Sequence, residues 1–212
     1  MRKEQNPEYY VSVREDLIQL IPAQAKKVLE VGCAAGMTGK ALRERGFEEI
    51  IGIEINGEVA QSGKSYYHQL IVGDVEKVNL PVHQEHFDCI LYGDVLEHLV
   101  DPWRVLKEHH AFLKKGGAII CSIPNIRHYR VLKKLILRGK WEYVGDGVLD
   151  RTHLRFFTLD SIQRMFDEAG FEVKELVRRR SGASWLRWIN RIVGRRLEEF
   201  LVRQYIVVAI KR

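Results

Sequence analysis

Cysteine is scarce in this sequence, since only three of its 212 residues are Cys. Cys33, Cys89 and Cys121 each lie in or beside an apolar segment, and no Cys-x-x-Cys pair occurs. An odd number of cysteines without metal-binding spacing argues against a disulfide framework and indicates reduced thiols. The eight histidines show no clear ligand pattern either, so no metal is predicted. Four of them are interpreted as surface residues: His83, His86, His109 and His110.

Long apolar runs are also missing. No run reaches the roughly 18 residues that a membrane-spanning helix needs. The polar residues 1–7 are not followed by the apolar core of a signal peptide. We therefore expect a cytoplasmic protein.

Two phosphate-binding fingerprints are absent as well. The glycines of the first glycine-rich loop fall at Gly32, Gly36 and Gly39, with Ala34 where a dinucleotide loop has its second glycine. The Lys-Ser or Lys-Thr pair of a P-loop does not follow. These departures argue against a NAD-dependent oxidoreductase, which remains the less favoured enzyme class.

The composition is that of a globular protein, with 46% hydrophobic and 29% charged residues. The net charge is +6, and the arginines gather after residue 177. Such asymmetry fits either a solvated face or an acidic partner: nucleic acid, a phosphorylated substrate or a membrane surface.

Strands and helices alternate along the first 124 residues, which predicts parallel βαβ units in one α/β domain over residues 1–212. We expect strands at residues 27–31, 49–55, 69–72, 87–92, 118–123, 171–177 and 204–210. We expect helices at residues 38–45, 59–67, 102–113 and 159–168, an N-terminal helix within residues 1–24, and a basic amphipathic helix at 184–203.

The first predicted strand ends in Glu30 and leads through the small-residue turn Gly32 to Gly36 into a helix. Small side chains allow close approach of a ligand to the backbone, and a helix N-terminus offers free N–H groups. Glu54 and Asp74 end the next two predicted strands. Since the carboxyl ends of parallel strands line one crevice, these three carboxylates are expected to share a site for an ammonium group, a ribose and an adenine amino group.

These segments resemble the motifs of class I S-adenosylmethionine-dependent methyltransferases. Residues 30–36 are similar to the first motif, Glu54 to the ribose-binding acid, residues 73–75 to the adenine-binding corner, and residues 87–98 to the fourth motif with its Leu-Glu-His signature. The resemblance covers residues 25–175. It implies a three-layer αβα Rossmann-like sandwich whose mostly parallel seven-stranded sheet has an antiparallel last strand.

The resemblance also implies S-adenosyl-L-methionine as cofactor. The expected cofactor-binding residues are Glu30, Gly32, Cys33, Ala34, Gly36, Glu54, Ile55, Asp74, Val75, Tyr92, Gly93 and Asp94.

Methyl transfer to a hydroxyl needs a base for the acceptor's proton, and His98 and His153 are the candidates. His98 follows the fourth strand, where it serves either as the base or as a scaffold for the loop after it. His153 lies in an insertion, residues 125–158, where such enzymes bind the acceptor. Asp150, His153 and Arg155 are candidate substrate residues, and the alternative is a loop tied by Asp–Arg pairs.

The insertion resembles loops of bacterial methyltransferases that modify sugars and polysaccharides. We therefore expect methylation of a small-molecule acceptor, at a hydroxyl of a sugar, polysaccharide precursor or other metabolite. The alternative is a non-catalytic protein that binds S-adenosylmethionine or nucleic acid, although no RNA-binding signature beyond charge is present. The helix at 184–203 fits a core cover, a homodimer contact or peripheral membrane contact with a lipid-linked acceptor.

Overall fold

The computed structural model describes residues 12–182, 188, 190–192, 194 and 196–212. Its strands are β1 (Lys27–Val31), β2 (Glu49–Glu54), β3 (Gln69–Val72), β4 (Phe87–Gly93), β5 (Leu113–Pro124), β6 (Phe171–Arg180) and β7 (Val202–Lys211). Its α-helices are α2 (Glu15–Ile18), α3 (Met37–Glu44), α4 (Gly57–Gly63), α5 (Pro102–Phe112), α6 (Tyr129–Arg138), α7 (Leu159–Glu168) and α9 (Glu198–Leu201). Two 3₁₀ turns, η1 (Lys64–Tyr66) and η2 (Leu96–His98), complete the elements.

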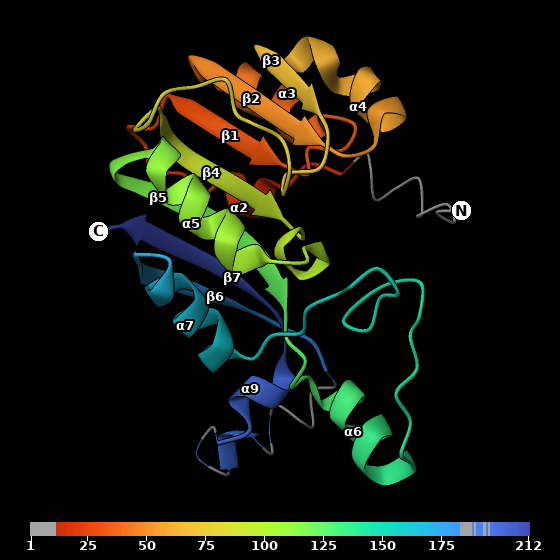
Figure 1. The fold of residues 1–212 in the computed structure, drawn as a ribbon. Helices are drawn as coiled ribbons and strands as arrows, with labels where there is room; N and C mark the ends of the chain where they lie inside the picture. Colours follow the sequence, from red (N-terminus) through yellow and green to blue (C-terminus); the bar gives the residue numbers. More distant parts are fainter. Residues whose placement is uncertain (1–11, 183–187, 189, 193, 195) are drawn as a thin grey trace.

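The seven strands form one sheet in the order β3-β2-β1-β4-β5-β7-β6 (Figure 1). The ladders from β3 to β5 are parallel, whereas β7 runs antiparallel to both of its neighbours, β5 and β6. The reversal between β1 and β4 puts a topological switch point at the carboxyl ends of these two strands, where open α/β sheets bind ligands. The predicted fold class is confirmed.

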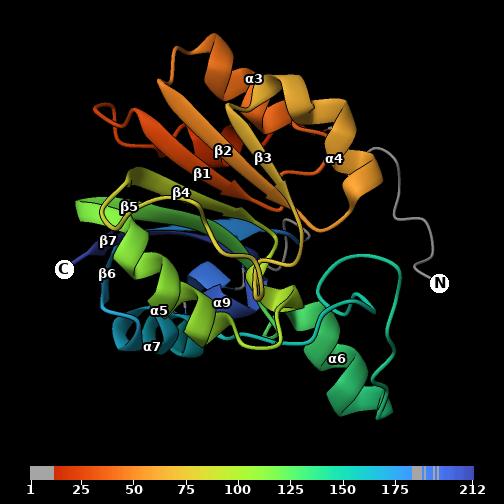
Figure 2. The same cartoon turned by 45° about the horizontal axis from the view of Figure 1, so that its top comes forward.

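The sheet buries a separate core on each face. On one face, Leu29 and Val31 pack in a cluster with Val105 of α5 and Phe166 of α7. On the other face, Val28 packs with residues of α2 and α3. Figure 2 shows the sheet between these helical layers. Because side chains of a strand alternate between faces, the sequence position of a residue decides which layer it meets.

The predicted boundaries near β5 are wrong. This strand begins at Leu113 rather than at residue 118, because Leu113 is buried and pairs with Phe87. The segment 114–117, which lies between the predicted helix at 102–113 and the predicted strand at 118–123, therefore belongs to the strand, and Gly116 accommodates its irregularity with a φ of +74°.

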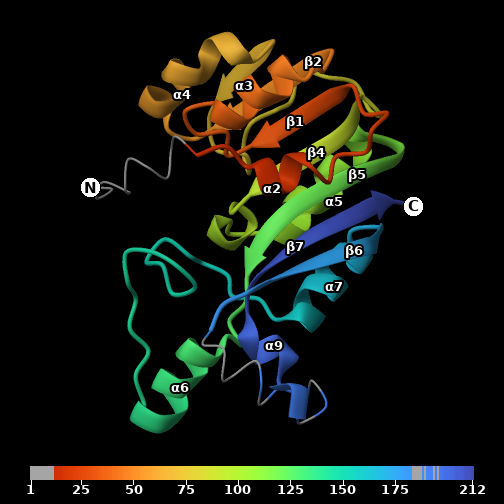
Figure 3. The same cartoon turned by 180° about the vertical axis from the view of Figure 1, so that it is seen from behind.

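The insertion at residues 125–158 leaves the sheet after β5 and returns before α7. It carries α6, which projects away from the carboxyl ends of the strands (Figures 1 and 3). Its two ends are joined where Asn125 forms a parallel bridge with Phe157. The insertion therefore starts and finishes beside the end of β5.

Two predicted helices lie partly outside the described residues. Within the described part of the N-terminal helix, α2 covers Glu15–Ile18. Of the predicted helix at 184–203, residues 184–187, 189, 193 and 195 lie outside them. Residues 188 and 190–192 are helical, and the segment ends in α9, which is followed directly by β7. In the part of the chain that the structure describes, no helix has the length and apolar character needed to cross a bilayer.

Candidate functional site

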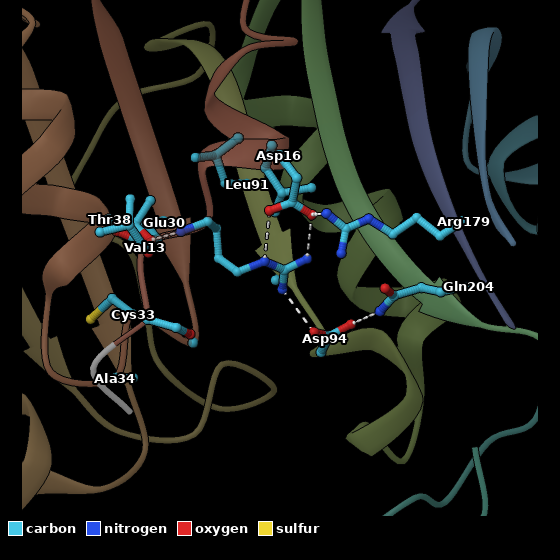
Figure 4. A pocket seen from close by; sticks show the side chains of 15 residues that line it. Val13, Asp16, Glu30, Cys33, Ala34, Thr38, Leu91, Asp94, Arg179 and Gln204 are labelled. Carbon is cyan, nitrogen blue, oxygen red and sulfur yellow. Dashed lines mark hydrogen bonds and ion pairs between the residues drawn. The ribbon is translucent and has the colours of Figure 1, made fainter. Parts of the chain in front are cut away.

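A pocket of about 350 Å³ lies beside the switch point of the sheet. Its wall includes six of the residues expected to bind the cofactor: Glu30, Gly32, Cys33, Ala34, Gly93 and Asp94 (Figure 4). They come from the ends of β1 and β4 and from the turn after β1. The structure thus brings together the first and fourth motifs.

Glu30 lies at the inner end of this pocket and is 6% exposed. Its Oε2 accepts a hydrogen bond of 2.7 Å from the Tyr67 hydroxyl. Burial raises the pKa of Glu30 to about 7, against the lowering effect of that hydrogen bond. A carboxylate in this position would be stabilised by a bound ammonium group, which is what the sequence predicted for it.

The turn after β1 is left-handed at three positions: Gly32 (φ +73°), Ala34 (φ +48°) and Gly36 (φ +79°). Such backbone is strained for any residue other than glycine, so Ala34 stores strain beside the pocket. Gly36 forms the N-cap of α3, and a Cβ built on it would lie 2.7 Å from the Cα of Gly63. Glycine is therefore required where this turn crosses the helix α4.

Glu54 holds the turn in place. One carboxylate oxygen accepts from the Ala34 N–H at 2.9 Å, and the other accepts from the Asn56 N–H at 2.9 Å. Glu54 is 7% exposed and does not line the pocket. Each oxygen keeps a second lone pair, so these contacts leave room for the predicted ribose hydroxyls.

Arg14 is a pocket residue that the sequence patterns did not indicate. Its guanidinium donates to Asp94 Oδ2 at 2.7 Å, to Ser122 Oγ at 2.9 Å and to both carboxylate oxygens of Asp16 at 3.1 Å. Asp16 also forms an ion pair with Arg179 at 2.9 Å (Figure 4). The segment before α2 is thereby tied to β4, β5 and β6.

Asp94 links this pocket to a larger one of about 760 Å³. Both pockets are lined by Asp94, Arg179 and Gln204. Asp94 adopts a left-handed φ of +57°, and its Oδ1 accepts hydrogen bonds from Ser122 Oγ at 2.7 Å and from the Gln204 amide. A strained acidic residue thus lies at the boundary between two adjoining cavities.

The structure places the Tyr92 side chain away from the predicted cofactor site. Tyr92 faces the core beneath α5, where its hydroxyl is hydrogen-bonded to Nδ1 of His109. Its neighbour Leu91 faces the pocket instead, since successive side chains of a strand point to opposite faces. Burial lowers the pKa of His109 to about 4. His109 is only 4% exposed, so the surface prediction for this residue is wrong.

The other histidines expected at the surface differ among themselves. His86 is 9% exposed and pairs with Glu49 at 2.9 Å, so it too is buried. His83 is exposed as expected, and His110 is half-buried.

Four other predicted cofactor residues also lie off the described pocket. Ile55 is exposed, and Val75 packs in the core. Asp74 accepts from the Glu76 N–H at 3.0 Å and pairs with Lys77 at 2.9 Å. Gly36 and these three residues keep their cofactor role only as a prediction.

The larger pocket contains both predicted bases. His98 is supplied by η2 after β4, and His153 by the loop of the insertion. Their ring centroids are 4.7 Å apart, and Glu97 lies in the same pocket with 1% exposure. Burial is the main cause that lowers the pKa of both imidazoles. Burial therefore favours the neutral form of both rings.

Glu97 is the least expected member of this pocket. Burial, reinforced by the nearby Asp94, raises the pKa of Glu97 well above its usual range. Its backbone carbonyl accepts from the N–H groups of Leu154 at 2.8 Å and Arg155 at 3.0 Å. These two bonds fix the insertion loop against η2.

The predicted substrate residues separate in the structure. Asp150 and His153 line the larger pocket. Arg155 does not: its guanidinium donates to the carbonyls of Leu154 and Val100 and lies 6.0 Å from the centre of the Trp103 ring. The expected Asp150–Arg155 grouping is therefore not formed, because Arg155 is directed to the outer side of η2.

The missed pocket residues share one sequence signal. Each of them lies on a strand, two residues from an apolar residue that packs on the α2 side of the sheet, and therefore faces the same side. The pairs are Leu91 with Cys89, Ser122 with Ile120, Gln204 with Ile206, and Arg179 with Val177. Alternation along each strand therefore identifies them once the strand order is known.

Comparison with known proteins agrees with this geometry. A family model described as a methyltransferase domain matches residues 3–176. A ubiquinone biosynthesis O-methyltransferase of Haemophilus ducreyi is 29% identical over 164 residues, which cover 71% of this chain and 67% of the relative. One of Pseudomonas aeruginosa is 30% identical over 161 residues, covering 72% and 67%. Across these and similar relatives, the aligned part spans about two thirds, 64% to 67%, of their length.

Two solved structures have the same fold. A methyltransferase of Thermotoga maritima, described as a possible histamine N-methyltransferase, has a TM-score of 0.65 at 21% identity and covers 93% of this chain and 86% of its own. A methyltransferase of Archaeoglobus fulgidus has a TM-score of 0.68 at 18% identity, covering 92% and 91%. The NAD-dependent alternative is therefore wrong, and the chain belongs to the S-adenosylmethionine-dependent methyltransferases with a class I fold.

Proposed function

We propose that the protein transfers the methyl group of S-adenosylmethionine to a hydroxyl oxygen of a small, anionic acceptor, such as a phosphorylated sugar or polysaccharide precursor. The observation that carries this proposal is the pair of adjoining pockets with a common wall of Asp94, Arg179 and Gln204. One pocket holds the cofactor motifs, and the other offers space for an acceptor next to it.

The charges of the larger pocket support an acceptor that carries both hydroxyls and an anionic group. Arg179, Arg180 and Arg203 lie among its lining residues. Asp94 and Asp150 lie there too, and carboxylates accept hydrogen bonds from hydroxyl groups. Arginine suits phosphate because its planar fork of N–H groups donates two parallel hydrogen bonds.

The names of the curated relatives support oxygen as the methyl acceptor, since they are O-methyltransferases. In the reaction, an oxygen lone pair of the acceptor forms a bond to the methyl carbon. The carbon–sulfur bond breaks and its electron pair returns to sulfur, which gives S-adenosylhomocysteine. The hydroxyl proton leaves, so the products are a methyl ether and one proton. Alignment of the two reactants supplies most of the acceleration.

Residues 129–144 favour a lipid-linked form of this acceptor. Ile136 and Leu137 on α6 are 73% and 71% exposed, and Lys133, Lys134 and Arg138 are exposed beside them. Exposed apolar residues flanked by basic ones suit the surface of an anionic membrane. The helix belongs to the same insertion as the acceptor pocket (Figure 1).

The acceptor is tested with methyl-labelled S-adenosylmethionine and two panels of compounds, phosphorylated sugars and their neutral counterparts. We expect label only with the phosphorylated panel, and Arg203→Gln should raise the KM for the acceptor about tenfold, as expected for one lost charge-assisted contact. Arg164→Gln, on the far helix α7 and exposed, is the matched control. Equal labelling of both panels, or an unchanged KM in Arg203→Gln, contradicts an anionic acceptor.

Membrane contact is tested separately by flotation of the protein with phosphatidylglycerol or phosphatidylcholine vesicles. We expect flotation with the anionic vesicles only, and its loss in Ile136→Glu/Leu137→Glu. Val72→Glu, at an exposed position on the edge strand β3, should float normally. Absence of flotation with either vesicle removes the membrane from the proposal and leaves a water-soluble acceptor.

A further inference from the structure

We propose that Glu97, His98 and His153 bind a divalent transition-metal ion at the wall of the acceptor pocket. One ligand atom of each residue lies within 4.8 Å of the other two. Two atoms bound at about 2.1 Å on opposite sides of an ion lie about 4.2 Å apart, and adjacent ones lie closer. Small side-chain rotations therefore close this group around a single ion.

The hydrogen bonds of the two histidines leave the metal-binding nitrogen free on each ring. His98 Nδ1 lies 3.2 Å from the carbonyl oxygen of Thr152, and His153 Nδ1 lies 3.1 Å from that of Val148. A carbonyl can only accept, so Nδ1 carries the proton and donates in both rings. Nε2 of each ring then keeps its lone pair. Metal-binding histidines are oriented by this kind of backbone hydrogen bond.

Glu97 supplies an independent observation. Its Oε2 is one of three buried side-chain atoms without a hydrogen-bond partner among the described residues. The residue is only 1% exposed. A buried polar atom without a partner costs about 1–3 kcal/mol, and native proteins rarely keep one without a purpose. A cation bound between Glu97 and the two imidazoles would give this oxygen its partner.

The donor set indicates the class of metal. Two imidazole nitrogens and one carboxylate oxygen suit Zn²⁺, Fe²⁺, Co²⁺ or Mn²⁺, whereas Mg²⁺ and Ca²⁺ prefer oxygen alone. Three protein ligands leave positions open for a further group, as in catalytic rather than structural sites. Since the group lines the larger pocket, those positions face the acceptor.

The role of the ion rests on the proposed function. A bound ion would lower the pKa of an acceptor hydroxyl coordinated to it and so favour transfer of the hydroxyl proton to water. His98 and His153 would then act as ligands rather than as general bases. The sequence alone did not indicate this site, because His153 is far from Glu97 and His98 along the chain and meets them only where the insertion folds back on η2.

The binding test uses untagged full-length protein freed of metal with EDTA. We would titrate it with Co²⁺, followed by visible absorption, and with Zn²⁺, followed by calorimetry. We expect one equivalent of each ion to bind. Glu97→Gln and His153→Gln should each weaken binding about 100-fold or more, since even residues that only support a ligand change affinity 10- to 100-fold.

The double variant His83→Gln/His86→Gln is the matched control, because it removes another neighbouring pair of histidines whose nitrogens lie 3.3 Å apart. We expect unchanged binding in this control. S-adenosylhomocysteine binding without metal verifies that each variant is folded. A rise in the Tm of the unsubstituted protein on adding Zn²⁺ needs no variant at all.

Absence of saturable binding at one equivalent, or binding that is lost in the control and kept in Glu97→Gln, overturns the metal site. Metal-independent methylation of an acceptor together with no metal binding refutes the site and leaves the proposed function standing. Tight metal binding without methylation of any hydroxyl compound refutes the proposed function and leaves the site standing.

Discussion

Arg14 donates a hydrogen bond to Asp94 across 2.7 Å, which joins the segment before α2 to the turn after β4. Both side chains are largely buried, with 19% and 24% of their surfaces exposed. Asp94 lines both pockets, and Arg14 lines the smaller one. A contact between distant parts of the chain thus organises the centre of the site.

Replacing Arg14 should destabilise the fold. In Arg14→Met, Asp94 and Asp16 lose a charged donor while they remain partly buried, and we expect a loss of about 2 kcal/mol in the free energy of unfolding. Urea unfolding measures this loss. The control Arg164→Gln breaks an exposed pair with Asp160 and should lower the free energy of unfolding by less than about 1 kcal/mol. Equal losses in the two variants would refute a special role for Arg14.

The turn after β1 should tolerate no side chain at Gly36. Gly36 and Gly46 have nearly the same left-handed φ, +79° and +80°, but of the two only Gly36 has backbone within 4 Å of the place that a Cβ would take. Gly46→Ala should therefore lower the free energy of unfolding by about 1 kcal/mol from backbone strain alone. Gly36→Ala should lower the free energy of unfolding by clearly more than Gly46→Ala, since Gly63 Cα cannot move away without shifting α4. Thermal unfolding compares the two, and similar Tm values would contradict this argument.

Glu54 should be needed for cofactor binding. Glu54→Ala removes the acceptor for the Ala34 and Asn56 N–H groups and the predicted ribose contact together. We expect S-adenosylmethionine and S-adenosylhomocysteine to bind at least about tenfold more weakly, which corresponds to about 1.4 kcal/mol. Calorimetric titration measures both, with exposed Glu58→Ala as the control. Unchanged affinity in Glu54→Ala would remove Glu54 from the cofactor site.

Cofactor binding should strengthen with pH near neutrality. Burial raises the pKa of Glu30 to about 7, and only its ionised form attracts an ammonium group. We therefore expect the affinity for S-adenosylmethionine to rise between pH 6 and 8. Calorimetry at several pH values measures this rise, and Glu30→Gln should bind weakly with no such dependence. A parallel rise in Glu30→Gln would assign the titration to another group.

The Glu30 carboxyl should make the folded state less stable as the pH rises, which is opposite to its expected effect on cofactor affinity. Its folded-state pKa lies above the ordinary value of 4.5, so the unfolded chain ionises first as the pH rises. The folded state is relatively favoured below pH 4.5 and loses this advantage as the pH rises through 7. Glu30→Gln should therefore raise the Tm at pH 8 more than at pH 5. An equal change at both values would show that Glu30 is not buried as a costly charge.

The sequence was sufficient for the order of strands and helices because buried parallel strands are continuous apolar runs separated by turn signals. It also predicted Glu30, Asp94 and the turn from Gly32 to Gly36 as site residues from their spacing at strand ends, and of these Glu30, Gly32, Cys33, Ala34 and Asp94 line the smaller pocket. It misplaced the start of β5, because Leu113 joins the strand by pairing with Phe87 of β4 and no local sequence pattern indicates this pairing.

Side-chain directions at the site depended on the tertiary structure. The direction of Tyr92 toward α5 follows from strand alternation, but which face carries the pocket depends on where α2 and Arg14 pack. The direction of Arg155 away from the larger pocket depends on its hydrogen bonds to the carbonyls of Leu154 and Val100.

The sequence by itself determined the fold class and the cofactor motifs, because local patterns and short spacings encode both. Only the tertiary structure decided which residues complete the site: Arg14 from the N-terminal segment, Arg179 from β6, Gln204 from β7, and His153 beside Glu97. These residues are far apart in the chain. Their proximity results from the packing of the whole sheet and its insertion, for which no local sequence pattern exists.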